Sequence, residues 1–226
     1  MVLSDIDASG LSEIASDLGG DVVGLPGDVC DPAYHHELVD LALSEFGALD
    51  IAVNNAGIVS PMQRIPDTNP EFAQRVVDVD LMGVFYALQA QLPVMSSRFE
   101  EEGTPAAIVN IASAAGLVGS PFLAIYAAAK HGVVGLTRSA AAEYGRKGVR
   151  VNAVCPSFAN TTMLTDFLDA STKGRAAAEA SLTRGIPMGR IGQVDEVVRA
   201  VLFAASQENS FMTGETLSVD GGLAAV

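Results

Sequence analysis

Short apolar runs alternate with helix-like segments from one end of the chain to the other. The apolar runs predict β-strands at residues 2–4, 22–25, 49–53, 106–111, 149–154 and 215–219. Between these runs, apolar residues recur at helical spacing, which predicts helices at residues 9–18, 33–46, 70–99, 121–146, 162–182 and 194–206. Strands that alternate with helices are typical of βαβ units, in which helices cover both faces of a parallel sheet. The pattern therefore predicts an α/β fold with a doubly wound parallel sheet.

The whole chain, residues 1–226, is expected to form a single domain. No shift of composition, no Pro- or Ser-rich linker and no internal repeat divides it. Residues 160–187 are the least regular stretch, in which polar residues lie among apolar ones. We interpret this stretch as a lid, that is, a mobile cover over a cleft. A poorly patterned surface helix is the alternative.

The composition indicates a globular protein of the cytoplasm. Of the 226 residues, 49% are hydrophobic and 18% are charged, which suffices for a sizeable core. A net charge of −14 is repelled by phosphate backbones and anionic membranes, so neither a nucleic acid nor a membrane is expected as a partner. The opening residues lack the basic-then-apolar order of a signal peptide. Cys30 and Cys155 are isolated thiols, expected to be buried in a reducing compartment.

Candidate chemistry is concentrated in residues 108–130. Ser113 follows the predicted strand at 106–111, at the edge where α/β sheets place their ligands. Tyr126 and Lys130 are four residues apart on the next predicted helix, so their side chains share one face. A phenol ordinarily has a pKa of about 10, and a neighbouring ammonium is expected to lower that pKa and permit proton exchange. Each feature alone also has a structural interpretation: Tyr126 and Lys130 as a surface pair on an amphipathic helix, and Ser113 as a cap after the strand.

Five motifs in this order along the chain resemble those of the short-chain dehydrogenase/reductase family. They are Asp28-Val29, Asn54-Asn55-Ala56-Gly57, Ser113 with the pair Tyr126 and Lys130, the stretch from Pro156 to Thr161, and Val219-Asp220-Gly221-Gly222. The fourth has Ser157 where the family pattern has glycine. The resemblance covers nearly the whole chain, and the motifs together are far more specific than any one of them.

The resemblance implies hydride transfer between a nicotinamide dinucleotide and an alcohol or a carbonyl compound. It implies that Tyr126 is the general acid and base, that Lys130 lowers its pKa and holds the nicotinamide ribose, and that Ser113 polarises the substrate oxygen. The same resemblance assigns the remaining cofactor contacts to Asp28, Val29, Asn54, Ala56, Gly57, Pro156, Phe158 and Thr161. It also implies a homotetramer or homodimer, for which the helices predicted around 81–99 and 121–144, rich in Ala and Leu, are the candidate interface.

Asp5 predicts NAD rather than NADP as the cofactor. A carboxylate at the end of the first strand can accept hydrogen bonds from both ribose hydroxyls, whereas it would repel a 2′-phosphate. No Arg or Lys occurs before Arg64 to reverse this preference. Two alternatives remain open: Asp5 and Asp7 end the strand as turn residues, or Asp7 takes the role given to Asp5.

Asp80 is one departure from the family pattern. It stands where the family has an asparagine that fixes a proton-relay water, and an ionised carboxylate cannot donate the hydrogen bond that an amide donates. Asp80 is kept as a candidate catalytic residue with an altered relay.

The second departure concerns the family's first strand and glycine-rich turn. The dinucleotide fingerprint precedes its ribose-binding acid by about 20 residues, which places it upstream of Met1. We therefore expect a Rossmann-type sheet without its first, central strand. Its absence would leave a slot about 9.6 Å wide, which two edges must close or another segment must fill. We also expect a chain of this length to bind NADH weakly and to melt at a low temperature.

The substrate pocket is predicted to be apolar. Its candidate residues lack a charged anchor and favour a neutral, fairly hydrophobic secondary alcohol or ketone: Ala115, Leu117, Phe122, Met163 and Phe167. A non-catalytic binding protein on a truncated scaffold of this family is the main alternative, and a lyase or epimerase is a third. No metal site is predicted, because the adjacent His35 and His36 do not face one way on a helix and are expected to be solvated.

Overall fold

The computed structural model describes residues 1–59, 61–169 and 174–226, without the side chains of Met163, Asp166 and Phe167. Within these residues the strands are β1 (Val2–Asp5), β2 (Val23–Pro26), β3 (Ile51–Asn54), β4 (Ala106–Ile111), β5 (Val149–Pro156) and β6 (Thr216–Val219). The helices are α1 (Ala8–Leu18), α2 (Pro32–Phe46), α3 (Pro70–Val77), α4 (Gly83–Glu102), α5 (Ala124–Tyr144), α6 (Thr162–Asp169), α7 (Arg175–Thr183) and α8 (Val194–Ala205). Each predicted strand and helical segment has a counterpart among the described residues, with some shifted boundaries; residues 170–173 of the helix predicted at 162–182 lie outside them.

The strands form two parallel sheets rather than one. β3, β4, β5 and β6 pair in that order, and β1 pairs with β2. The predicted Rossmann-type α/β fold with parallel strands is confirmed. No ladder joins β1 to β3 in the described part of the chain, and no other strand lies between them, so the two edges neither close onto each other nor receive a third segment.

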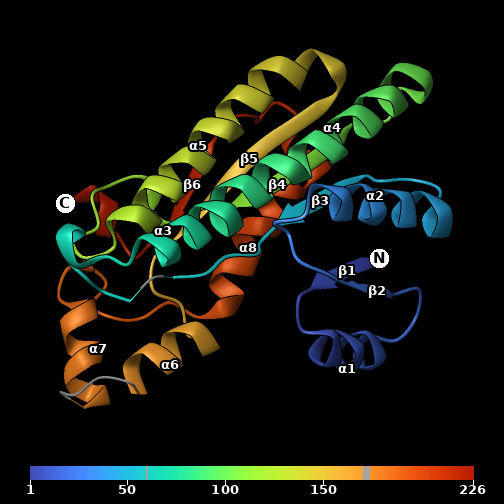
Figure 1. The fold of residues 1–226 in the computed structure, drawn as a ribbon. Helices are drawn as coiled ribbons and strands as arrows, with labels where there is room; N and C mark the ends of the chain where they lie inside the picture. Colours follow the sequence, from blue (N-terminus) through green and yellow to red (C-terminus); the bar gives the residue numbers. More distant parts are fainter. Residues whose placement is uncertain (60, 170–173) are drawn as a thin grey trace.

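Helices cover both faces of the four-stranded sheet (Figure 1). α4 and α5 pack on one face, beside α2, and α8 packs on the other. The residues of β4 and β5 between these layers, such as Ile108, Val109 and Val151, have no exposed surface. A strand buried on both faces has no solvent-facing side, which is why these segments are mostly apolar, with Asn110, Arg150 and Asn152 as buried exceptions.

The β1–α1–β2 unit is covered much less. No residue of either strand is buried, and Leu11 is the one buried residue of α1. The side chains of Ile14 and Leu18 remain more than half exposed. β3, at the edge of the larger sheet, also exposes Ile51 and Val53 on one face.

Local chemistry explains where several helices begin, and also where one prediction is wrong. Asp31 caps α2 by accepting the N–H of Ala33, and Pro32 occupies its first turn. The helix expected to begin at residue 121 begins instead at Ala124. Phe122 has a φ of +68°, a left-handed value that an α-helix does not accommodate.

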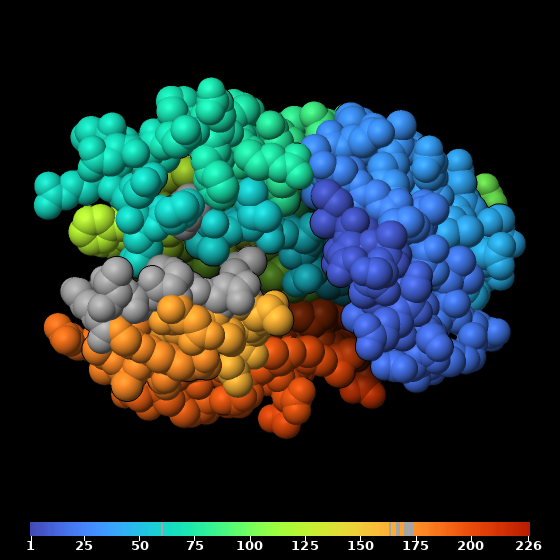
Figure 2. Space-filling view, turned by 60° about the horizontal axis from the view of Figure 1, so that its bottom comes forward, coloured from blue at the N-terminus to red at the C-terminus, as the bar shows by residue number. Residues whose placement is uncertain are grey.

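The parallel strands bring several candidate site residues to the carboxyl edge of the sheets. The carboxyl ends of parallel strands meet at the same side of a sheet, and there Asp5 ends β1, Asn54 ends β3 and Pro156 ends β5. Beyond β5, α6 and α7 stand apart from the sheet over their own small cluster of Leu164, Leu168 and Ala178. Figure 2 shows a cleft between this pair of helices and the teal segment that precedes α4. The lid at 160–187 stays a prediction, and residues 170–173 within it lie outside the described residues.

Candidate active site

Ser113 is held between the carboxyl ends of β4 and β5. Its Oγ accepts the N–H of Ala115 at 3.2 Å, which caps the short 3₁₀ turn that follows β4. The same hydroxyl donates to the Pro156 carbonyl at 3.4 Å. Ser113 thus acts locally as a cap, and its position at the sheet edge is the one expected from the sequence.

Tyr126 and Lys130 share one face of α5, as their spacing predicts. Tyr126 lies in the first turn of the helix, and the Lys130 Nζ is 5.7 Å from the centre of its ring. Nζ also donates to the Ile111 carbonyl at 3.1 Å, so Lys130 is anchored to the end of β4 and is only 3% exposed. The structure therefore brings Ser113, Tyr126 and Lys130 together.

The pKa of Tyr126 differs in direction from the expectation. Burial raises the pKa of Tyr126 to about 12; the Ser113 side chain acts to lower it, and the Asp80 charge acts to raise it. The expected lowering by Lys130 is not found. In the described structure the Lys130 ammonium forms an ion pair with Asp80, with Nζ 3.7 Å from Oδ2 and 5.7 Å from the centre of the Tyr126 ring.

Asp80 lies in a single π-helical turn, Asp78–Met82, that joins α3 to α4. Its Oδ1 accepts the N–H of Ile58 at 2.8 Å, and its Oδ2 is 3.7 Å from the Lys130 Nζ. The residue is fully buried, and Oδ2 has no hydrogen-bond partner in the described structure. Burial raises the pKa of Asp80 and lowers the pKa of Lys130, while each of the two charges opposes that effect on the other.

Gly57 lies close to both members of this pair. A Cβ at position 57 would lie 3.3 Å from the Lys130 Nζ and 3.5 Å from the Asp80 Oδ1. A side chain here would press on the flexible end of Lys130, which would have to shift by a few tenths of an ångström, so glycine eases the close approach. The Gly57 backbone thus lies beside Lys130.

Asn54 is part of a polar network beneath the site. Its side chain donates to Asn110 on β4 at 2.8 Å and exchanges hydrogen bonds with Gln91 on α4 at 3.2 and 2.9 Å. Asn110 donates in turn to Thr137 on α5 at 3.0 Å. Sequence reasoning missed Gln91, Asn110 and Thr137. Asn110 could have been found from the sequence, because a polar residue within a mostly apolar predicted strand indicates a buried hydrogen-bonding side chain.

The carboxylates at the end of β1 have separate partners. Asp7 caps α1 by accepting the N–H groups of Ser9 and Gly10 at 3.0 and 3.2 Å. Asp5 is exposed and accepts the Asp7 N–H at 2.9 Å. Because Asp7 is engaged as a helix cap, Asp5 is the better placed of the two to meet a ligand.

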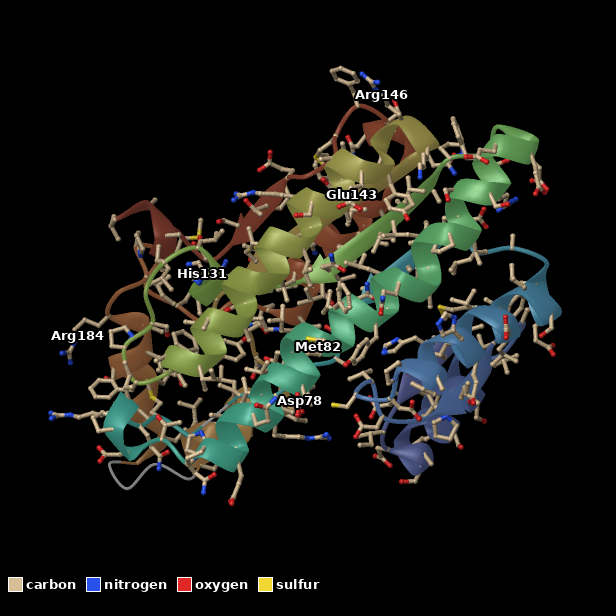
Figure 3. The ribbon with its side chains drawn as sticks, turned by 45° about the horizontal axis from the view of Figure 1, so that its top comes forward. Asp78, Met82, His131, Glu143, Arg146 and Arg184 are labelled. Carbon is tan, nitrogen blue, oxygen red and sulfur yellow. The ribbon has the colours of Figure 1, made fainter. Side chains whose placement is uncertain are left out.

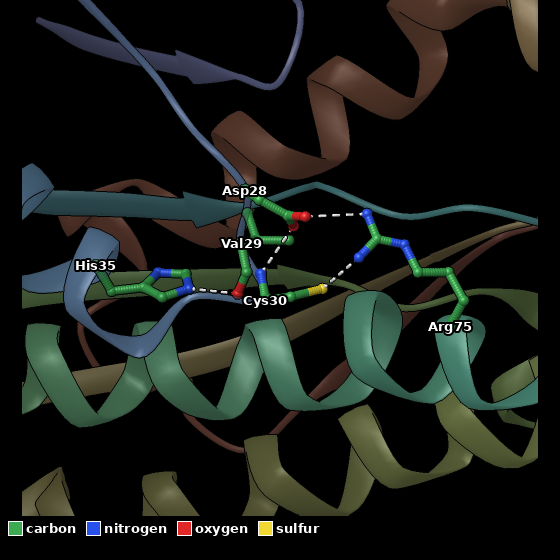
Figure 4. A network of polar contacts seen from close by, with 5 residues as sticks. All are labelled: Asp28, Val29, Cys30, His35 and Arg75. Carbon is green, nitrogen blue, oxygen red and sulfur yellow. Dashed lines mark hydrogen bonds and ion pairs between the residues drawn. The ribbon is translucent and has the colours of Figure 1, made fainter. Parts of the chain in front are cut away.

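Asp28, Val29 and Cys30 belong to a network shown in Figure 4. Asp28 accepts the Cys30 N–H at 2.9 Å and a hydrogen bond from Arg75 on α3 at 3.0 Å, and Arg75 also contacts the Cys30 Sγ at 3.2 Å. The His35 Nε2 bonds to the Val29 carbonyl at 2.8 Å. Two expectations are corrected here. His35 is buried rather than solvated, with its pKa lowered by burial, and Cys30 is partly exposed rather than buried.

The remaining candidates lie beyond β5 and before α5. Phe158 accepts the Gly192 N–H at 3.0 Å through its carbonyl, and Thr161 is exposed. Leu117 packs against the apolar core between the sheet and helices α4 and α5. Of the residues predicted to line the pocket, Ala115 and the half-exposed Phe122 therefore stay candidates among the described side chains. Met163 and Phe167 are outside the described side chains.

A search of the described residues finds no group of three or more His, Cys, Asp or Glu side chains able to hold a metal ion. In the same part of the chain, none of the helices is both long enough and apolar enough to span a bilayer.

Comparison with known sequences matches residues 1–224 to a family described as enoyl-(acyl carrier protein) reductase. A cyclohexanol dehydrogenase of Acinetobacter sp. (strain SE19) is 37% identical over 98% of this chain and 83% of its own length. A cis-4-hydroxycyclohexanecarboxylate dehydrogenase of Sinomonas cyclohexanicum is 38% identical over 100% of this chain and 87% of its own. Because these matches take in nearly the whole chain, they give no support to the expectation that its first strand is lacking.

Solved structures of related enzymes superpose closely. A levodione reductase has a TM-score of 0.91 at 33% identity and covers 100% of this chain and 88% of its own. A 3-ketoacyl-(acyl-carrier-protein) reductase from Brucella melitensis complexed with NADH has a TM-score of 0.89 at 32% identity over 99% of this chain and 87% of its own. ElxO with NADP bound has a TM-score of 0.89 at 28% identity over 100% of this chain and 88% of its own.

Proposed function

Because this chain belongs to the short-chain dehydrogenase/reductase family and is an oxidoreductase of that type, we propose that it interconverts a secondary alcohol and its ketone with NAD(H). The observation that carries the proposal is the convergence of Ser113, Tyr126 and Lys130 at the carboxyl edge of the sheet. A hydroxyl, a phenol and an ammonium there can hold one substrate oxygen and exchange a proton with it.

The residues assigned to the cofactor fit a dinucleotide laid along one edge. Asp5 is exposed at the end of β1, Asp28 follows β2, and the Gly57 backbone lies against Lys130 in a space that a side chain would fill. In the proposed arrangement, Asp5 holds the adenosine ribose, Asp28 and Val29 meet the adenine, and Asn54, Ala56 and Gly57 line the middle. Lys130, Tyr126, Pro156, Phe158 and Thr161 hold the nicotinamide end. When bound, the nicotinamide supplies or accepts the hydride.

The chain's own residues manage the proton. During oxidation the Tyr126 oxygen takes the proton of the alcohol, and during reduction it returns a proton to the carbonyl oxygen. The Ser113 hydroxyl donates a hydrogen bond to the same oxygen and fixes its position. Lys130, held by the Ile111 carbonyl, supplies positive charge near the phenolate.

We propose a cyclic, neutral secondary alcohol as the substrate. Two relatives carry the names of cyclohexanol and hydroxycyclohexanecarboxylate dehydrogenases. In this chain, Phe122 presents a half-exposed aromatic ring four residues before Tyr126, and Ala115, which donates its N–H to Ser113, is small. An apolar ring can pack against an aromatic face without needing a charged anchor.

We propose NAD over NADP because of Asp5. The carboxylate is exposed at the strand end, where it can accept ribose hydroxyls and repel a 2′-phosphate. We further propose that the protein works in the cytoplasm as a homodimer or homotetramer. Exposed positions on α4 and α5, such as Phe85, Ala128 and His131, are the candidate interface.

A non-catalytic binding role remains the second candidate. The observation in its favour is that burial raises the pKa of Tyr126 to about 12, while Lys130 forms an ion pair with Asp80. A phenol in that state is a poor base near neutral pH.

A panel of cyclic and open-chain alcohols and ketones, followed by nicotinamide absorbance with NAD and NADP, tests the proposal. Tyr126→Phe should lower turnover by about 10²–10⁴-fold, the usual contribution of general acid–base catalysis. Tyr144→Phe at the other end of α5 is the matched control and should change turnover little. Unchanged turnover in Tyr126→Phe, or no turnover of any substrate by the unmodified protein, would defeat the enzyme proposal and favour the binding role.

A further inference from the structure

The Asp80 carboxylate is unusual among the buried polar groups of this chain. It has no exposed surface, and its Oδ2 has no hydrogen-bond partner in the described residues. An unpartnered carboxylate oxygen in a dry site is costly unless a positive charge faces it. The positive charge that faces Oδ2 is the Lys130 ammonium, at 3.7 Å.

The Lys130 ammonium therefore has two neighbours whose negatively charged forms it can stabilise, the Asp80 carboxyl group and the Tyr126 phenol. Its Nζ is closer to Asp80 than to the centre of the Tyr126 ring, which is 5.7 Å away. The Ile111 carbonyl fixes the ammonium in this position. The polar groups that hold the ammonium are thus acidic or neutral, and they come from the π-helical turn and from β4.

The other titratable groups around Lys130 are few. Cys155 faces it from β5, and burial raises the pKa of this thiol to about 11. Arg138 and Asp220 act on that thiol with opposite signs. From the loop after β3, Ile58 contributes an uncharged N–H to Asp80. Asp80 is thus the one carboxylate within ion-pair distance of Lys130 in the part of the chain described.

We propose that Asp80 is a positioning residue. By pairing with Lys130, it offsets the positive charge near the phenol and so shifts proton transfer by Tyr126 to higher pH. The inference rests on the proposed oxidoreductase function and names a determinant of its pH range. Asp80 pairs with Lys130 rather than with the phenol, and its negative charge offsets that of the ammonium at Tyr126. An asparagine at this position would keep the shape and the contact to Ile58 but would carry no charge.

The direction of the effect follows from the charges. A negative charge near Lys130 and Tyr126 disfavours the phenolate, so it raises the pKa of Tyr126. Removing that charge leaves the ammonium free to favour the phenolate and lowers the pKa. Alcohol oxidation requires the basic form of Tyr126, so its rate should then rise at lower pH.

The test compares Asp80→Asn with Asp78→Asn, the same charge change two residues away in the same turn. Asp78 binds the Gln74 side chain and forms no ion pair with Lys130 in the described structure; it is labelled in Figure 3. The ionisation of Tyr126 is read as tyrosinate absorbance minus that of the matching Tyr126→Phe protein, with circular dichroism to verify the fold at each pH. This readout needs no turnover. We expect Asp80→Asn to move the midpoint down by about one pH unit or more, and Asp78→Asn to leave it in place.

The acid limb of the oxidation rate should move by the same amount in Asp80→Asn. An unmoved midpoint in folded Asp80→Asn would overturn the proposal, and so would an equal shift in Asp78→Asn. If the midpoint moves but no substrate turns over, the proposed function fails while the electrostatic role of Asp80 stands.

A second variant covers the case in which Asp80→Asn does not fold. Without its partner, a buried Asp80 becomes neutral, so Lys130→Met removes both charges together. We then expect the Tyr126 midpoint to stay close to its original value. An upward shift of about one unit or more in Lys130→Met would mean that the ammonium favours the phenolate even while Asp80 is charged, which contradicts the proposal.

Discussion

The two sheets of this protein are built from similar apolar runs but are covered very differently. β4 and β5 lie between α8 on one side and α4 and α5 on the other, and most of their residues are fully buried. β1 and β2 contain no buried residue, and their helix α1 contributes Leu11 alone. A strand-forming sequence therefore does not by itself produce a firmly packed strand; a second layer of side chains does.

The difference separates two tasks. The proposed proton chemistry at Ser113, Tyr126 and Lys130 lies on the well-packed sheet. The proposed recognition of the adenosine lies at the ends of β1 and β2, in the thinly covered unit. Arg75 joins the two parts, because it extends from α3 to Asp28 beyond β2 (Figure 4).

The largest expected effect is at Arg150, in the well-packed region. Its guanidinium donates to the carbonyls of Ala204, Ala205, Ser206 and Met212, joining β5 to the end of α8. Arg150→Met removes the guanidinium from the Ala204 and Ala205 carbonyls, whereas those of Met212 and Ser206 keep the Asn152 side chain and the Asn209 N–H as donors. The substitution should cost about 3–5 kcal/mol of unfolding free energy. Arg146→Met, in the exposed 3₁₀ turn that follows α5 (Figure 3), should cost almost nothing. Urea unfolding of both variants measures the difference, and equal stabilities would contradict the assigned role.

The second prediction uses two valines paired in register across β3 and β4. Val109 is fully buried, whereas Val53 beside it is 47% exposed. Val109→Ala should cost about 2 kcal/mol, the value of two buried methyl groups and a small cavity, and Val53→Ala less than about 0.5 kcal/mol. Urea midpoints check this. Equal losses would mean that the exposed face of β3 is covered in solution.

The third prediction concerns Asp5 in the thinly covered unit. Asp5→Ser should weaken NADH binding by about tenfold, since a charged hydrogen bond is lost. It should also reduce the difference between the affinities for NADH and NADPH. Asp17→Ser on exposed α1 is the control with the same change of charge. Nicotinamide fluorescence titration gives the affinities. A protein that binds both cofactors equally before mutation would contradict the NAD assignment.

The smallest effect is expected at Asp7. Hydrogen bonds from the Ser9 side chain and from the N–H groups of Gly10 and Ser9 hold the pKa of Asp7 below its ordinary 3.8. A lowered pKa means that the cap stabilises α1 fully above pH 3.8 and is lost as the pH falls through the lowered value. Amide exchange of α1 should therefore accelerate in acid before that of β4. Asp7→Asn, which caps without a charge, should remove the pH dependence, and its persistence would point to another group.

The sequence predicted best where burial imposes a single pattern. The run at 106–111 coincides with β4 because a strand covered on both faces is apolar at almost every position, Asn110 being the exception. The spacing of Tyr126 and Lys130 predicted their shared helix face for a similarly local reason.

The failures have in common that distant packing decides them. His35 is buried by the ring of Tyr86 on α4, 51 positions along the chain, which no periodicity in α2 reveals. The raised pKa of Tyr126 depends on burial and on Asp80, which comes from another element. Nothing in the spacing of Tyr126 and Lys130 could show that the ammonium faces Asp80 instead.

The free edge of β3 has a consequence for how the protein behaves in concentrated solution. β3 pairs with β4 along one side only in the described structure, and its exposed face carries Ile51 and Val53. Such an edge is a template on which a strand from another molecule can align. The net charge of −14 keeps copies apart by repulsion, and salt at 0.1 M shortens that repulsion to about 10 Å. Colloidal stability should therefore decline as salt is added, even where the fold itself is unaffected.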